Sequence, residues 1–186
     1  MKGLTAVVPD PTDLSTDDFL GGRLSILQPR KGHRSGIEAV LIAAMAPLQP
    51  QETVIDIGSG VGVAGLCAIA RVPDTEAVLV EADPAAADLA RDNAARNGFS
   101  DRAGIVVDDV TARDAIDRCG LIEAADHAVA NPPFYDPAAS RISPEKATAH
   151  ATPDVALDAW LRFAVAALKP AGSLTLVHRA EALEMV

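Results

Sequence analysis

The sequence predicts an α/β protein built on a mainly parallel sheet with helices on both faces. Three observations support this class. From residue 53 onward, short apolar runs alternate with stretches of helical periodicity, which is the pattern of βαβ units. A glycine-rich turn follows the first apolar run, where such folds bind ligands. Aromatic residues make up only 3% of the 186 residues, so the core must be aliphatic, which suits helices packed on a parallel sheet.

The bounds of the individual elements are predicted from residues that begin or end helices, strands and turns. Residues 1–16 are expected to form an arm, and residues 19–28 an extended, hairpin-like piece that turns at Gly21 and Gly22. A helix over 35–46 begins with Ser35 as its cap and ends before Pro47. The remaining strands are expected at 53–57, 77–80, 105–107, 127–130 and 173–178, and the remaining helices at 62–70, 84–97, 112–119 and 154–168.

The charge is uneven along the chain, whose formal net charge is −10. Residues 51–140 hold sixteen acidic and six basic side chains, which argues against that surface lying along a phosphate backbone. Between Asp18 and Glu38 there is no acid. This leader stretch is either a solvated loop that balances local charge or a contact for an anion or RNA, and its basic candidates are Arg23, Arg30, Lys31, His33 and Arg34.

Cysteine usage and hydropathy exclude several classes. Cys67 and Cys119 show neither CxxC nor Cys/His spacing, so neither a disulfide framework nor a metal site is expected. The N-terminus lacks a signal-peptide pattern, and the longest apolar run is far too short to span a bilayer. The sequence therefore predicts a cytoplasmic protein with no membrane partner and no metal, and it leaves the oligomeric state open.

The glycine-rich turn is the strongest local signal. A hydrophobic strand ends in an acid, and glycines then let a ligand approach the backbone closely. A dinucleotide fingerprint would have glycine at position 63, where this chain has Val63. The GxGxG pattern resembles motif I of the S-adenosylmethionine-dependent methyltransferases, whose positively charged cofactor suits a nearby carboxylate. The candidate cofactor residues in this stretch are Asp56, Gly58, Ser59, Gly60 and Gly62.

Acids also end the next two strands. Glu81 stands about where an acid hydrogen-bonds a ribose diol, while Asp83 is expected to cap the following helix. Asp109, favoured over Asp108, can accept from an adenine amino group while Val110 packs on the ring. Nicotinamide binding and a purely structural turn are the alternatives, and this series of acids makes both less favoured. The candidate cofactor contacts here are Glu81, Ala82, Asp109 and Val110.

An Asn-Pro-Pro-Phe turn ends the fourth strand. Two prolines fix φ and remove backbone N–H groups, so the oxygens at Asn131 and Pro132 are expected to accept the two hydrogens of an amino group. Phe134 can stack on a planar substrate. Catalysis would then be mostly positioning, with no general base before attack. A rigid proline turn without chemistry is the alternative. The candidate catalytic residues are Asn131, Pro132, Pro133 and Phe134.

This turn, with residues 56–62 and Glu81, resembles class I amino-methyltransferases. The leader at 18–24, with 28–29, 32–34 and 39–43, resembles that of the bacterial valine-tRNA adenine N6-methyltransferase family. The resemblance implies a Rossmann-like methyltransferase fold, S-adenosylmethionine as cofactor, contacted also by Asn131, and methylation of N6 of an adenosine in tRNA. Phe134 departs from the tyrosine that is common there. The candidate substrate contacts, of which the basic ones come from the leader stretch without acids, are Arg30, Lys31, Arg34 and Tyr135.

We expect a single domain over 1–186. Residues 1–50 form the leader and first helix, and residues 51–186 form the cofactor-binding core, which is expected to lack its C-terminal strands, as in a fragment of a longer protein. Two other functions remain open. One is a glutamine N5-methyltransferase acting on a protein, for which the same turn would hold a side-chain amide. The other is a non-catalytic protein that binds S-adenosylmethionine.

Overall fold

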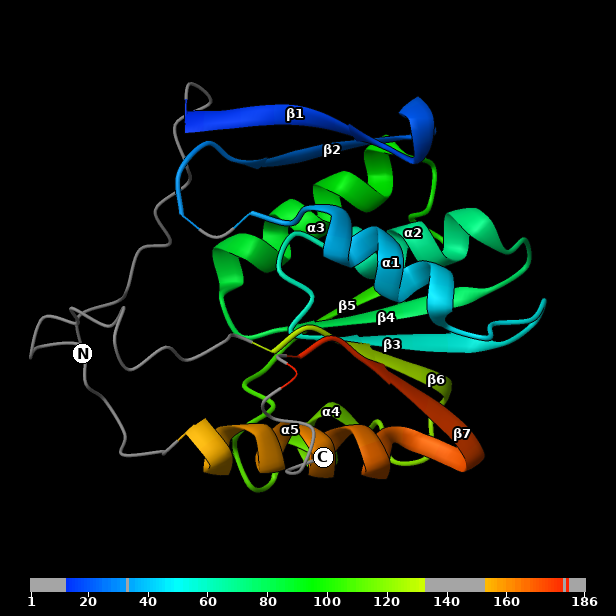
Figure 1. Ribbon diagram of the computed structural model, residues 1–186, viewed down its shortest axis with the longest axis vertical. Helices are drawn as coiled ribbons and strands as arrows, with labels where there is room; N and C mark the ends of the chain where they lie inside the picture. The colour runs from blue at the N-terminus through cyan, green and yellow to red at the C-terminus, as the bar shows by residue number, and fades with distance from the viewer. Residues whose placement is uncertain (1–12, 33, 133–152, 179, 181–186) are drawn as a thin grey trace, which may run out of the picture.

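Five parallel strands form the central sheet of the computed structural model, which describes residues 13–32, 34–132, 153–178 and 180. Their order is β5-β4-β3-β6-β7 (Figure 1). The chain thus steps outward from β3 in one direction, then returns to add β6 and β7 on the other side, which places a topological switch point between β3 and β6. The strands are β3 (Thr53–Ile57), β4 (Glu76–Glu81), β5 (Ala103–Val107), β6 (Ala125–Ala130) and β7 (Leu168–Leu176).

Helices cover both faces of the sheet, as the sequence predicts. The helices α1 (Ile37–Met45), α2 (Val63–Arg71) and α3 (Pro84–Arg96) lie on one face, and α4 (Ala115–Cys119) and α5 (Pro153–Ala167) lie on the other (Figure 1). Alternate residues of β3 enter two different cores, since Val54 packs under α1 to α3 whereas Ile55 and Ile57 pack against α4 and α5. A strand buried on both faces has no polar alternation. None of the described helices is both long and apolar enough to cross a membrane.

An antiparallel hairpin lies above the helices of the first face (Figure 1). It consists of β1 (Leu14–Phe19) and β2 (Leu24–Pro29), joined through a short 3₁₀ turn. The predicted extended piece is confirmed, but the prediction that the arm continues to residue 16 is wrong. Pairing with 27–29 extends the strand back to Leu14, because distant polar side chains hold it there. Arg34 and Gln28 both donate to Asp17 Oδ2, at 2.6 and 2.9 Å.

Two asparagines of α3 attach the hairpin to the main domain. The Asn93 side chain accepts from the Leu27 N–H at 2.7 Å and donates to the Leu27 carbonyl at 2.9 Å. Asn97 makes the same pair of bonds to Ser25, at 2.9 and 3.0 Å. Asn93 also donates to the Val61 carbonyl at 3.0 Å. The free edge of β2 is therefore bonded to side-chain amides, which satisfy its backbone groups as a neighbouring strand would.

Three of the element boundaries that differ from the prediction have a visible structural cause. The cap of α1 is Gly36 and not Ser35, because the Glu38 carboxylate folds back and accepts from the Gly36 N–H at 2.7 Å. The fourth helix begins at Ala115 and not at residue 112, after a turn around Asp109. Strand β7 begins at Leu168, since a bulge in its pairing with β6 takes up the predicted turn at 170–172. The predicted cap of α3 is confirmed, with Asp83 accepting from the Ala85 N–H at 3.0 Å.

Candidate active site

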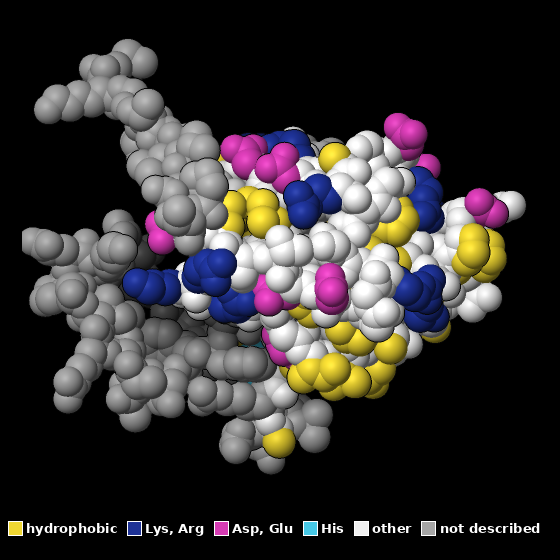
Figure 2. All heavy atoms as spheres, turned by 90° about the horizontal axis from the view of Figure 1, so that it is seen from above, with side chains coloured by type: hydrophobic (Ala, Val, Ile, Leu, Met, Phe, Trp, Pro, Cys, Tyr) yellow, Lys and Arg dark blue, Asp and Glu magenta, His cyan; other side chains and the backbone are white. Residues whose placement is uncertain are grey.

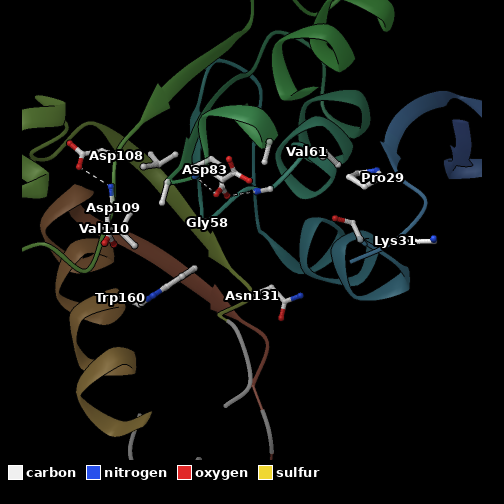
Figure 3. Close-up of a pocket in the computed structure, with 16 residues that line it drawn as sticks. Pro29, Lys31, Gly58, Val61, Asp83, Asp108, Asp109, Val110, Asn131 and Trp160 are labelled. Carbon is white, nitrogen blue, oxygen red and sulfur yellow. Dashed lines mark hydrogen bonds between the residues drawn. The ribbon is translucent and has the colours of Figure 1, made fainter. Parts of the chain in front are cut away.

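A cavity of about 480 Å³ opens at the carboxyl ends of β3, β4, β5 and β6, next to the topological switch point (Figure 3). Because all these strands are parallel, their terminal loops meet at one edge of the sheet. Seven of the predicted cofactor residues line this cavity, namely Gly58, Gly60, Glu81, Ala82, Asp109, Val110 and Asn131. Of the other three, Asp56 and Ser59 line a second, smaller cavity, and Gly62 lines neither.

The glycine loop is shaped to leave space at one position and to pack tightly at another. Gly60 has φ +56° and would have nothing within 4 Å of an added Cβ, so its backbone is open to the cavity. Gly62 also has positive φ, but an added Cβ would lie 2.9 Å from Leu79, so this glycine serves packing. The loop is fixed by a bond from the Ser59 N–H to the Val80 carbonyl at 3.0 Å.

Glu81 joins two loops of the cavity. One carboxylate oxygen accepts from the Gly60 N–H and the other from the Asp83 N–H, both at 2.8 Å. Each oxygen keeps a further lone pair, and the side chain lines the cavity. Glu81 is therefore held rigidly while it can still accept from a diol, which is the geometry the ribose prediction requires.

Asp56 lies behind the glycine loop instead of in the main cavity. It is 4% exposed, and its carboxylate accepts from the Gly65 N–H at 2.8 Å. Burial, together with the charge of Glu81, raises its pKa to about 7. The carboxyl also lines a second cavity of about 30 Å³, which is shared with Ser59, Glu38 and Asn131. Asp56 thus ties the loop to the start of α2, and at neutral pH it is only partly ionised.

The loop after β5 separates the roles of two neighbouring aspartates. Asp108 has both oxygens engaged by Arg118, and this hydrogen bonding holds the pKa of Asp108 below its usual range. Asp109 uses one oxygen, Oδ1, to accept from Thr111. Its other oxygen has no bond among the described residues, which favours Asp109 as the acceptor for an adenine amino group. Val110 is 7% exposed and lines the cavity beside it.

Asn131 follows β6 directly and lines both cavities. Its Oδ1 atom is buried, and within the described part of the chain it has no hydrogen-bond partner. A buried polar atom without a partner is costly, so it marks a place where a ligand group can donate. Ser59 Oγ nearby is also buried and has no hydrogen-bond partner among the described residues. Pro132 is buried, whereas Pro133, Phe134 and Tyr135 lie outside the described residues.

The predicted substrate residues do not come together. Lys31 is exposed and lines the mouth of the main cavity, and Arg30 beside it is also exposed. Arg34 is engaged within the hairpin, where it donates to Asp17, to Ser15 Oγ at 2.9 Å and to the Pro29 carbonyl at 2.5 Å. The guanidinium therefore stabilises the leader. On the hairpin side of the molecule, Figure 2 shows Lys and Arg side chains interspersed with acidic ones.

Among the lining residues that sequence reasoning missed, Trp160 of α5 has the largest side chain. Its six-membered ring lies so close to Gly58 that an added Cβ there would be 2.1 Å from Trp160 Cη2. The only available signal was that this is the single tryptophan of the chain, placed in a helix otherwise read as amphipathic. Nothing in its spacing indicates that the side chain reaches the sheet edge.

These residues fit S-adenosylmethionine as the cofactor. Strand-end acceptors at Glu81 and Asp109 suit a ribose and an adenine amino group, and the open backbone at Gly60 admits a ligand beside them. Asn131, whose Oδ1 has no hydrogen-bond partner among the described residues, follows β6, on the other side of β3 from Glu81 and Asp109. The cavity can thus hold a nucleoside at one side and present a hydrogen-bond acceptor at the other.

Comparisons with known proteins place the chain among methyltransferases. The family model of the methyltransferase small domain matches residues 37–184. Proteins named tRNA1(Val) (adenine(37)-N6)-methyltransferase from Dickeya chrysanthemi and Porphyromonas gingivalis are 32% and 31% identical over 92% and 88% of this chain. The same name belongs to a Bacteroides thetaiotaomicron protein that is 30% identical over 76% of the chain. The matches span 66%, 66% and 58% of those relatives' own lengths.

Solved structures share the fold. A protein described as a predicted O-methyltransferase, Atu636 from Agrobacterium tumefaciens, superposes with a TM-score of 0.63 and 27% identity, covering 78% of this chain and 63% of that one. TrmN from Thermus thermophilus gives a TM-score of 0.59 and 22% identity, covering 78% of this chain and 39% of that one. The likeness to these two confirms the Rossmann-like methyltransferase architecture.

Proposed function

The chain belongs to the methyltransferase small domain family, and on this premise we propose that it transfers a methyl group from S-adenosylmethionine to N6 of an adenosine in tRNA. The curated relatives carry the name of that activity, with adenine 37 of a valine tRNA as the target. Because the chain spans only about three-fifths to two-thirds of their length, their activity is a proposal for this chain.

The observation that carries the proposal is that Asn131 Oδ1, in a residue lining the cofactor cavity, is buried with no hydrogen-bond partner among the residues that the structure describes. Methylation of an exocyclic amine requires that its N–H groups be held, so that the nitrogen lone pair points at the electrophile. When bound, S-adenosylmethionine supplies the methyl group as that electrophile. Asn131 Oδ1 accepts one amine hydrogen, and the ring of Pro132 restricts the backbone of Asn131 before it. The methylated nitrogen then releases its proton to solvent.

The choice of adenosine in tRNA is supported by the relatives and by the cavity mouth. Lys31 lines the mouth and Arg30 is exposed next to it, so a polyanion can approach there despite the net charge of −10. A glutamine amide of a protein would use the same acceptor. The substrate experiment below therefore includes both.

Asn131→Ala tests the proposal. We expect it to keep the affinity for S-adenosylhomocysteine within a few-fold and to lower methylation of unmodified tRNA by about 10²–10³, the usual loss when one positioned hydrogen-bonding group is removed. The product would be detected as N6-methyladenosine by mass spectrometry of digested tRNA. Ile122→Ala, at an exposed site outside both cavities, is the control and should behave as wild type.

The outcomes separate the parts of the proposal. Wild-type methylation by Asn131→Ala would refute the role of the turn. Methylation of a release-factor glutamine but not of tRNA would refute the substrate and leave the role of Asn131 standing. Binding of S-adenosylhomocysteine by calorimetry, without turnover on either substrate, would favour a non-catalytic protein.

A further inference from the structure

We propose that Trp160 forms the surface on which the target nucleobase stacks while its amine is held by Asn131. The inference deepens the proposed function and rests on it, because it names the chemistry of the substrate side of the same cavity. It predicts that this site recognises a planar aromatic base in preference to an aliphatic amide.

The position of the indole is the first argument. Trp160 projects from α5 toward Gly58, with Asn131 to one side (Figure 3). One part of the side chain packs against the core beneath the sheet, but the residue also lines the cavity and is partly exposed. A tryptophan that only filled the core would have no reason to reach the ligand side of the sheet edge.

The second argument is the register of β3 and β6. Ile57 pairs with Ala130, so Gly58 and Asn131, the next residues of the two strands, lie about one strand spacing apart, roughly 5 Å. The ring against Gly58 is therefore close to the oxygen that holds the amine. A purine with its amino group at Asn131 extends over that distance, so its ring can reach the indole.

The cofactor's adenine has a different place from the target base, which is the third reason for the proposal. Its candidate acceptor Asp109 follows β5, and the candidate ribose acceptor Glu81 ends β4, whereas Asn131 follows β6 on the opposite side of β3. The indole contacts the loop of β3, between the two groups. Its face toward Asn131 is thus available to the substrate.

The pairing of Gly58 with Trp160 supports a built contact. Any side chain at position 58 would collide with the indole, because even a Cβ would be 2.1 Å from Cη2. A loop with a larger residue would push the ring away from Asn131. Glycine at position 58 therefore leaves space for the aromatic ring and also allows the local backbone conformation.

Fluorescence provides the direct test, because Trp160 is the single tryptophan. The full chain would be saturated with S-adenosylhomocysteine and titrated with an anticodon stem-loop carrying an unmodified adenosine at position 37. Stacking predicts quenching of the tryptophan by this RNA. A matched stem-loop with an abasic site at that position keeps the phosphates and should bind without quenching. Equal quenching by both RNAs, or none by either, would overturn the proposal.

Variants test the energetic role. Trp160→Leu should raise KM for the stem-loop about 5- to 150-fold, the loss expected for one base–aromatic stack, with S-adenosylhomocysteine affinity changed less than about twofold. Trp160→Phe keeps an aromatic face and should restore most of the affinity. Val165→Ala, on an exposed position of the same helix, is the matched control. An unchanged KM in Trp160→Leu, or an equal loss in the phenylalanine variant, would refute stacking.

The proposal stays testable if the chain methylates no tRNA. In that case the S-adenosylhomocysteine complex would be titrated with free adenosine and with a glutamine-containing peptide. Quenching by adenosine alone would support a nucleobase surface even though the tRNA substrate had failed. Quenching by neither ligand, or by the peptide, would overturn it.

Discussion

Replacing Gly58 with alanine measures how tightly the glycine loop and α5 fit together. An alanine Cβ would lie 2.1 Å from Trp160 Cη2, roughly 1.4 Å inside the normal separation of two carbon atoms. Overpacking of this kind costs about 1–3 kcal/mol. Gly58 also has φ +66°, which costs a residue with a Cβ about 1–2 kcal/mol. We therefore expect Gly58→Ala to lower the free energy of unfolding by about 2–5 kcal/mol.

Gly120→Ala isolates the backbone part of this loss. Gly120 has nearly the same φ, +65°, but an added Cβ would have nothing within 4 Å, so only about 1–2 kcal/mol should be lost. Urea unfolding followed by circular dichroism measures both variants. In a Trp160→Leu background, the cost of Gly58→Ala should fall to that of Gly120→Ala. If Gly58→Ala costs no more than Gly120→Ala in the wild-type background, the contact inferred between the loop and the indole is wrong.

Two further predictions concern the acids of the site. Glu81→Gln puts an amide NH₂ against the Gly60 or Asp83 N–H. The affinity for S-adenosylhomocysteine, measured by calorimetry, should therefore weaken by about 1.5–3 kcal/mol. An unchanged affinity would exclude Glu81 from the cofactor site. Burial raises the pKa of Asp56 from its ordinary value of 3.8 to about 7 in the folded state. The unfolded state loses the Asp56 proton first, so wild-type stability should fall by about 3 kcal/mol between pH 4 and 7 relative to Asp56→Asn. Parallel pH profiles of the two proteins would contradict the raised pKa.

The local sequence pattern was enough to predict the central sheet and the strand-end residues that line the cavity. Continuous apolar runs predicted strands buried on both faces, and the acids and glycines at their ends predicted the cavity edge where Glu81, Asp109 and Asn131 lie. These predictions succeed because parallel strands bring their carboxyl ends to one edge whatever the detail of the packing. The cap at Asp83 succeeds for a similar reason, since capping involves only neighbouring residues.

The same local reasoning failed where a side chain had a choice of partners. Arg34 was assigned to substrate from its place in a basic leader, yet it binds Asp17, 17 residues earlier in the chain. Asp56 was assigned to the cofactor's positive charge, yet burial places it behind the loop, bonded to Gly65. Ser35 was predicted to cap α1, yet the cap is Gly36, whose N–H donates to the Glu38 carboxylate. In each case the sequence indicated a polar interaction, but the partners in the structure differ from the predicted ones.

The amino-acid sequence by itself determined the order of elements, the parallel sheet and the chemistry gathered at its edge, because periodicity and strand ends are local properties of the chain. Only the tertiary structure decided that Asn97 bonds a strand 72 residues away and that Trp160 lies against Gly58. Such contacts depend on how helices and strands pack in three dimensions, and no spacing along the chain encodes which faces will meet.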